Sequence, residues 1–177
     1  MNANARRDAV KSLDAQDVLR IMYGDNAVPY PIDILAIAEN FGIDVYRAHF
    51  DHAAIGDTVN GFIEEQKDGS TRIVVNAADP SIRRRYTVAH ELSAFFAARD
   101  EKHMLRHVDF QSVRHTIADR SAAKFAAALL IPEKELRKEH GKLMWPTLGY
   151  LAKKFDVQPE IMRERLTDLG LDFIKAA

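Results

Sequence analysis

The hydrophobic pattern of the chain changes its period twice, and this change most restricts the fold. Three segments between residues 43 and 77 are rich in β-branched and aromatic residues, which predicts strands: IDVYRAHF (43–50), VNGFIEEQ (59–66) and TRIVVNA (71–77). Lys67, Asp68 and Gly69 supply the turn that joins the last two as a hairpin. Apolar residues recur at helical spacing on both sides of these segments. We therefore predict an α+β fold, in which a small antiparallel three-stranded sheet packs on a helical body.

Cap residues give the expected ends of the helices. Two helices precede the strands: Asp14 is the expected N-cap of the first, which Gly24 ends, and Pro31 opens the second, which stops at Gly42. The helices expected after the strands are a long one with Asp79 as N-cap and Pro80 at its first position, an Ala-rich one from Asp119 to Leu130, and short ones over 148–155 and 159–169.

Composition excludes several classes of function. The chain has 177 residues, which suits one domain with a small appendage, and we expect a main domain over 1–140 and a helical subdomain over 141–177. Because 25 Lys and Arg balance 26 Asp and Glu, bulk charge does not drive binding to nucleic acid. With no cysteine, a metal would need His, Asp and Glu ligands. No apolar run is long enough to span a bilayer, so we expect a cytoplasmic protein.

The long helix carries a histidine beside a glutamate, in YTVAHELSAFFAA. In an intact HExxH motif two imidazoles one turn apart bind one zinc, and the Glu acts as general base on the metal-bound water. Here His90 and Glu91 are present, but the residue one turn after His90 is Ala94, which has no lone pair to donate. The pair alone is an unspecific signal, because a partly buried histidine bonded to a neighbour is equally compatible with it.

The surrounding segments make the signal specific. PIDILAIAENFGIDVY, IVVNAAD, RRRYTVAHEL and KFAAALLIPEKEL occur in this order, and the chain from about Ala5 to Leu171 resembles the ImmA/IrrE family of zinc metallopeptidases. The resemblance implies a minimal zincin-like fold with a helical, helix-turn-helix-like C-terminal part. It also implies that His90 is the first zinc ligand and Glu91 the general base, while Ala94 and Ser121 stand where the family has its second His and its ligand Glu. We therefore expect no cofactor. The alternative is a bound zinc ion, which would mean that the site is not degenerate.

Other histidines are candidate replacement ligands. His103 and His107 lie one turn apart near acidic residues, and His115 and Asp119 have similar spacing. We interpret the first two as solvated loop residues, and we do not expect Asp119 to reach the zinc position, because it lies about 200° around the helix from Ser121.

Two basic groups are candidate binding residues. Arg83, Arg84 and Arg85 precede the His-Glu pair, and we expect one of them to have an internal carboxylate partner and the others to be able to dock an acidic partner. The C-terminal segment fits a helix-turn-helix pattern in which Lys153, Lys154, Arg163 and Arg165 could face phosphates. Because Glu160, Glu164 and Asp168 lie on the same helix, we favour a helical subdomain that closes the core, with DNA binding only through a partner.

Three functions follow. The first is a catalytically degenerate metallopeptidase-fold protein that acts by protein contact. The resemblance implies an XRE-type helix-turn-helix repressor or antitoxin as partner, in stress-response, mobile-element or toxin-antitoxin regulation, with this chain as the effector or toxin. The second is an active zinc endopeptidase that cleaves such a repressor. The third is a regulator that binds DNA directly.

Overall fold

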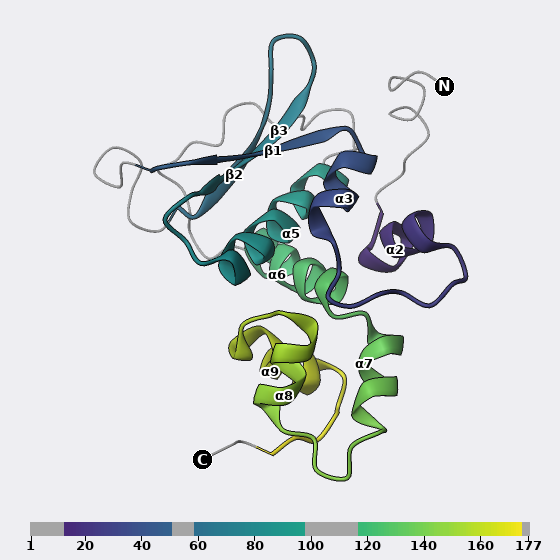
Figure 1. Cartoon of the computed structure of the whole chain (residues 1–177). Helices are drawn as coiled ribbons and strands as arrows, with labels where there is room; N and C mark the ends of the chain where they lie inside the picture. The colour runs from purple at the N-terminus through teal and green to yellow at the C-terminus, as the bar shows by residue number, and fades with distance from the viewer. Residues whose placement is uncertain (1–12, 51–58, 98–116, 175–177) are drawn as a thin grey trace.

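The computed structural model of the chain describes residues 13–50, 59–97 and 117–174. These residues form seven helices and a three-stranded sheet (Figure 1). In chain order the elements are α2 (Ala15–Tyr23), α3 (Ile34–Asn40), β1 (Ile43–Ala48), β2 (Gly61–Glu65), β3 (Thr71–Asn76), α5 (Ser81–Ala97), α6 (Ile117–Leu130), α7 (Glu133–His140), α8 (Leu148–Phe155) and α9 (Pro159–Asp168). The predicted α+β class is confirmed, and helix α7 has no counterpart among the elements predicted from the sequence.

The sheet is mixed rather than antiparallel. Its strand order is β1-β3-β2, and β3 pairs antiparallel with β2, with Ile63 opposite Ile73, and parallel with β1, with Val45 opposite Ile73. The predicted hairpin is confirmed, but the prediction of an all-antiparallel sheet is wrong. The hairpin reverses the chain after β2, so β3 runs antiparallel to β2 and parallel to β1. The strand β3 is the most apolar of the three and is almost wholly buried, which fits its place between the other two.

One face of the sheet covers the helical body. Ile43, Ile63, Ile73 and Val75 belong to one buried cluster with the apolar residues of α3 and α5. The sheet approaches α5 closely at Gly61, where an added Cβ atom would lie 2.5 Å from Cγ2 of Thr87. In Figure 1 the sheet lies above α3, α5 and α6. This arrangement holds α5, which carries the His-Glu pair, against the sheet on one side and α6 on the other.

Two helix starts differ from their predicted positions. Asp14 caps α2 in a capping box with Asp17, as expected. Helix α3 begins at Ile34 and is capped by Asp33, because the Asp33 side chain accepts from the backbone N–H of Ala36. Pro31 therefore precedes the helix rather than opening it. Helix α5 begins at Ser81, and the Pro80 carbonyl accepts its first hydrogen bonds, so Asp79 is not the N-cap.

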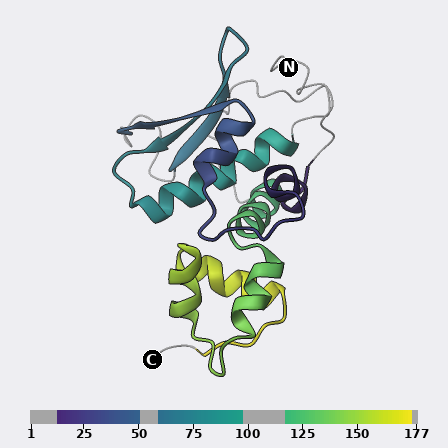
Figure 2. The same ribbon diagram turned by 45° about the vertical axis from the view of Figure 1, so that its right-hand side comes forward.

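The C-terminal helices lie together at one end of the molecule. In Figures 1 and 2, α8 and α9 lie below α5 and α6, with α7 beside them. Leu151, Phe155, Met162 and Leu166 are fully or almost fully buried and belong to the same cluster as the core of α5 and α6. The turn between α8 and α9 passes through Asp156, whose φ of 52° is in the left-handed region. The two helices thus form the expected helix-turn-helix-like unit, packed on the core.

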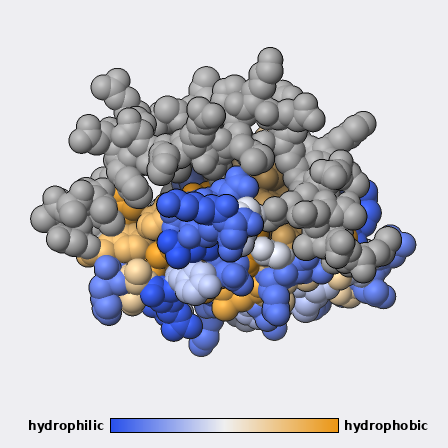
Figure 3. Space-filling model, turned by 90° about the horizontal axis from the view of Figure 1, so that it is seen from above, coloured by the Kyte–Doolittle hydropathy of each residue, from blue (hydrophilic) through white to orange (hydrophobic). Residues whose placement is uncertain are grey.

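Among the described residues, no helix has both the length and the hydrophobicity that a membrane crossing needs. The coloured part of the face seen in Figure 3 shows hydrophilic and hydrophobic areas side by side.

Candidate functional site

A cavity of about 580 Å³ lies where the first turn of α2 meets α5 and α6. Its lining consists of Leu13, Asp14, Asp17, His90, Glu91, Ser93, Ala94, Ala97, Ser121, Ala122 and Phe125. The four positions that the sequence assigns to zinc and catalysis, namely His90, Glu91, Ala94 and Ser121, therefore face one space, although Ser121 is separated from the other three by the whole connection between α5 and α6.

Helical spacing places the α5 residues at the cavity. His90, Ala94 and Ala97 follow each other at intervals of four and three residues, so they share one face of the helix. The face against the sheet and α6 carries Leu92 and Phe96, which are buried. The amphipathic pattern of α5 thus orients the helix and turns the His-Glu pair into the cavity.

Helix α6 forms the opposite wall in the same way. Ser121, Ala122 and Phe125 line the cavity, while Ala126 and Leu129, one turn further along the helix, are buried in the core. The ring of Phe125 lies 5.8 Å from that of Phe96, so the two helices meet through an aromatic contact beside the cavity. The small side chains of Ala94 and Ala97 on α5 and of Ser121 and Ala122 on α6 leave the cavity open beside this aromatic contact.

Ser93 is a polar residue of the cavity wall whose hydroxyl is used within the helix. Its Oγ donates a 2.6 Å hydrogen bond to the carbonyl of His90, three residues earlier, and the residue is 8% exposed. His90 is half-buried, and its ring lies 6.1 Å from that of Tyr86, one turn before it.

The described lining does not fit a zinc ion. Structural and catalytic zinc sites use at least three protein ligands drawn from His, Cys, Asp and Glu. Within residues 13–50, 59–97 and 117–174, no three such side chains come close enough together to hold a metal ion. Ala94 and Ser121, which are the residues expected at lost ligand positions, supply only a methyl group and a hydroxyl. His103, His107 and His115 lie outside the described residues, and Asp119 lies in the first turn of α6.

Two carboxylates at the cavity were not expected as site residues. Asp14 and Asp17 belong to the first turn of α2, and the sequence identified Asp14 only as a helix cap. They reach the cavity because α2 packs on α6. Nothing in the sequence predicts this contact, because α3, the three strands and α5 lie between α2 and α6 along the chain. Together with Glu91 they give the described part of the lining three acidic residues.

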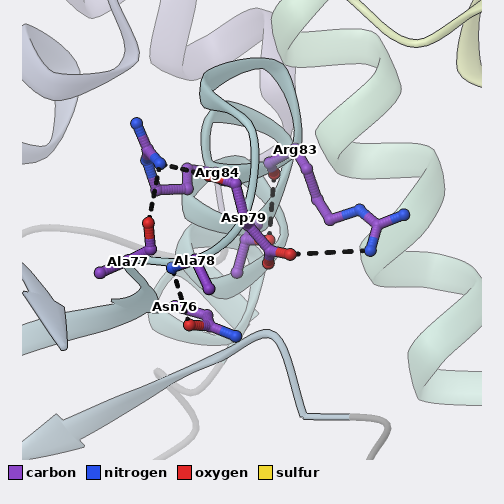
Figure 4. A network of polar contacts seen from close by, with 7 residues as sticks. Asn76, Ala77, Ala78, Asp79, Arg83 and Arg84 are labelled. Carbon is purple, nitrogen blue, oxygen red and sulfur yellow. Dashed lines mark hydrogen bonds and ion pairs between the residues drawn. The ribbon is translucent and has the colours of Figure 1, made fainter. Parts of the chain in front are cut away.

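The three arginines before the His-Glu pair all have partners inside the chain. Nη1 of Arg83 lies 3.6 Å from Oδ1 of Asp79, and Nη1 of Arg84 donates to the carbonyls of Ala77 and Asp79 (Figure 4). Nε of Arg85 lies 2.9 Å from Oδ2 of Asp156, and its Nη1 donates to the carbonyl of Ile32. Arg85 thus joins α5 to the turn between α8 and α9.

The basic residues of the C-terminal helices do not meet the cavity. Lys153 and Arg163 are exposed, and Nζ of Lys154 lies 6.0 Å from the ring centroid of Tyr30. Arg165 donates from Nε to the carbonyl of Ile131, and burial lowers the pKa of its guanidinium group. The exposed residues of α9 include Glu160, Glu164, Thr167 and Asp168, so this helix presents more acidic than basic groups.

Comparison with known proteins gives one family. The family model described as IrrE N-terminal-like domain matches residues 38–167, which includes every cavity residue on α5 and α6. No curated protein matches the chain significantly.

Proposed function

Because the chain belongs to the IrrE N-terminal-like domain family of metallopeptidase-like proteins, we propose that it uses the family's cleft for binding and lacks zinc-dependent peptidase activity. The observation that carries this proposal is the lining of the cavity. His90 and Glu91 line it together with Ala94 and Ser121. This lining supports the expectation that two of the family's ligand positions have lost their donors.

The loss matters because the metal does the activating in this class of enzyme. A general base such as Glu91 acts on water whose pKa the metal has lowered to about 7. One imidazole cannot hold zinc tightly enough for this role, since three or four ligands and their supporting hydrogen bonds set the affinity. The volume of the cavity, about 580 Å³, is in the range of pockets that bind small ligands and side chains.

Metal analysis tests the proposal. We expect the chain, purified without chelator and then dialysed against zinc, to contain far less than one equivalent. The double variant Ala94→His, Ser121→Glu restores the family's ligand set and is expected to bind about one equivalent. Adding His90→Ala to that double variant should remove the metal again, which shows that the rebuilt site is responsible. Near-equimolar zinc in the unmodified chain, lost on His90→Ala alone, would contradict the proposal and favour the alternative of an active zinc endopeptidase.

The partner we propose is an XRE-type helix-turn-helix repressor or antitoxin, with this chain as the effector or toxin that it restrains. The near-zero net charge and the acidic surface of α9 support a protein partner over DNA. The helix-turn-helix protein encoded beside this chain, where there is one, is the protein to test. Co-expression should give a complex that survives gel filtration at about 0.5 M salt, at which the screening length is only a few ångströms. Separate elution of the two purified proteins, or elution together only at low salt, would contradict this pairing.

A further inference from the structure

The two most exposed large hydrophobic side chains of the described residues are neighbours in the chain. Met144 is 85% and Trp145 is 70% exposed, and Tyr150 and Ile174 near them are exposed as well. We propose that these four residues, called the Trp145 patch below, form the centre of a two-fold interface between two copies of this chain. This inference goes beyond the proposed function and does not depend on the zinc content of the cleft.

The Trp145 patch lies at one end of the molecule. Met144 and Trp145 belong to the connection between α7 and α8, Tyr150 to the first turn of α8, and Ile174 to the C-terminal segment, which forms a backbone bridge with Thr147. In Figures 1 and 2 this connection forms the lower end of the molecule, opposite the sheet. The other exposed large hydrophobic residues of the described chain are scattered over α2, α3 and β1, namely Ile21, Leu35 and Tyr46. Single exposed residues of this kind are ordinary, whereas a group of four is typical of a contact surface.

Hydrogen bonds hold the connection in a fixed conformation. Where it begins, the backbone N–H of Leu143 donates to the carbonyl of His140 at 3.1 Å. Where it ends, the N–H of Ile174 donates to the carbonyl of Pro146 at 2.8 Å, and the N–H of Leu148 donates to the carbonyl of Ile174 at 3.2 Å. Binding through this connection therefore costs little conformational entropy, because the connection is already ordered in the single chain.

The exposed area of the Trp145 patch is large enough for the centre of an interface. At about 200 Å² for a large side chain, the exposed fractions of the four residues amount to roughly 500 Å² per copy. Two copies in contact would bury roughly 1,000 Å² from these residues alone, which is the size at which specific interfaces begin. Trp, Tyr and Met are also residue types that are enriched at protein interfaces.

The charges around the Trp145 patch favour a second copy over other occupants. Lys142 and Asp172 are exposed and each lies two residues along the chain from a patch residue, and exposed Lys138 lies one turn before Lys142. Lys142 also donates to Glu139 of its own chain. A two-fold contact places a surface against itself, so a rim that carries both signs lets Lys142 face Asp172 of the partner subunit. An anionic lipid surface or a nucleic acid favours a rim of cations alone, because it repels a carboxylate.

A contact at this end would join two chains without using the cavity. None of the four patch residues belongs to the cavity lining, which comes from α2, α5 and α6 and the residue before α2. The dimer would therefore carry two cavities related by a two-fold axis. Such a pair suits a partner that is itself a symmetric dimer, as helix-turn-helix proteins are when they bind palindromic sites.

Sedimentation velocity together with tryptophan fluorescence tests the proposal on the full chain. Trp145 is the single tryptophan of the chain, so its emission reports on the patch alone. We expect the mass to rise from 20.0 kDa toward twice that value as the concentration increases, with a dissociation constant of about 10 µM or below. The emission maximum should move to shorter wavelength over the same concentrations, because the indole ring leaves water when two copies meet.

Variants locate the contact. Trp145→Ser and Met144→Ser should each weaken self-association at least about tenfold. Because both side chains are exposed in the single chain, neither substitution should change thermal unfolding at concentrations where the chain is monomeric, and each variant serves if the other disturbs folding. Ile21→Ser is the matched control, because it removes an exposed hydrophobic side chain of α2 that lies outside the patch. It should leave the dissociation constant unchanged.

Three results would overturn the proposal. The first is a mass of 20.0 kDa and an unchanged emission maximum at every concentration. The second is an equal effect of Trp145→Ser and Ile21→Ser on self-association. The third comes from adding vesicles of phosphatidylcholine and phosphatidylglycerol to the monomeric chain: a shift of the emission to shorter wavelength there, without self-association, would assign the patch to a lipid surface instead. Because none of these measurements depends on metal, the proposed function stands or falls separately, by the zinc content.

Discussion

The hydroxyl of Tyr30 donates a 2.8 Å hydrogen bond to Oε2 of Glu139 and so joins the segment before α3 to the last turn of α7. Lys142 donates to the same oxygen at 2.9 Å, and the hydroxyl of Tyr150 donates to Oε1 at 3.0 Å. Glu139 is 4% exposed. The hydrogen bonds from Lys142, Tyr30 and Tyr150 lower the pKa of this carboxyl from 4.5 to about 2, although burial opposes them.

Replacing Glu139 by Gln should make the chain less stable at neutral pH and should change how stability depends on pH. The folded state favours the carboxylate, so the stabilisation is complete above pH 4.5 and is lost as the pH falls toward about 2. Urea unfolding at several pH values measures this. The difference in free energy of unfolding between the chain and Glu139→Gln should shrink as the pH is lowered from about 5. A constant difference across this range would mean that the carboxylate is not held in this way.

Tyr30→Phe directly tests the hydrogen bond between the segment before α3 and helix α7. The substitution removes one hydrogen bond to a charged, buried acceptor and keeps the ring, which stacks on Phe155 with centroids 4.6 Å apart. We expect a loss of roughly 1–3 kcal/mol in the free energy of unfolding, measured with urea at neutral pH. Tyr150→Phe should cost less, because Tyr150 is 43% exposed and water can replace its hydroxyl.

Gly61→Ala should destabilise the contact between the sheet and α5. A Cβ atom at residue 61 would lie 2.5 Å from Cγ2 of Thr87 and 2.8 Å from the carbonyl oxygen of Val74, so the backbone has to move. The expected cost is about 1–3 kcal/mol, measured by thermal or urea unfolding. Gly149→Ala is the matched control, because nothing lies within 4 Å of its added Cβ and the position is helical. It should be neutral or stabilising, and an equal loss at both sites would contradict the packing seen at Gly61.

Arg85→Met should cost more stability than Arg83→Met, although the two residues are neighbours in one basic run. Arg85 binds Asp156 and the carbonyl of Ile32 and is 20% exposed, whereas Arg83 is 48% exposed and lies 3.6 Å from its carboxylate. We expect a loss of about 1–2 kcal/mol for Arg85→Met and at most about 0.5 kcal/mol for Arg83→Met. Equal effects in urea unfolding would show that the contact of Arg85 with the turn between α8 and α9 adds nothing.

The purified chain should not bind duplex DNA at physiological salt. The guanidinium group of Arg165 donates a hydrogen bond to the carbonyl of Ile131. The exposed side of α9 carries three acidic residues beside Arg163, namely Glu160, Glu164 and Asp168. Fluorescence anisotropy with a labelled duplex measures this at several salt concentrations. Salt-sensitive binding that Arg163→Glu abolishes would instead support the direct DNA-binding regulator.

Much of the fold could be predicted because local signals agree with it. The capping residue Asp14, the Lys67–Gly69 turn and the runs of β-branched and aromatic residues identify their elements without knowledge of the rest of the chain. The direction of the pairing between β1 and β3 could not be predicted in this way. The hydrophobic pattern shows which residues are buried, but it does not show which side of the hairpin meets β1.

The residues of the candidate site were likewise predicted only in part from the sequence. Helical spacing and the family resemblance selected His90, Glu91, Ala94 and Ser121, and all four line one cavity. Asp14 and Asp17 were missed because they reach it through the packing of α2 on α6. That contact depends on apolar surfaces far apart in sequence, and a capping aspartate looks the same in a sequence whether its helix faces solvent or a cavity.

The central position of β3 determines when the sheet can form during synthesis of the chain. Both outer strands leave the ribosome before the strand that bonds to each of them, since β3 is the last of the three in the chain and pairs with both. A nascent chain that stops short of Thr71 therefore has no partner strand for β1 or β2, and the complete sheet can form only after Asn76 has emerged. Until then, the unpaired edges of β1 and β2 depend on other contacts to avoid aggregation.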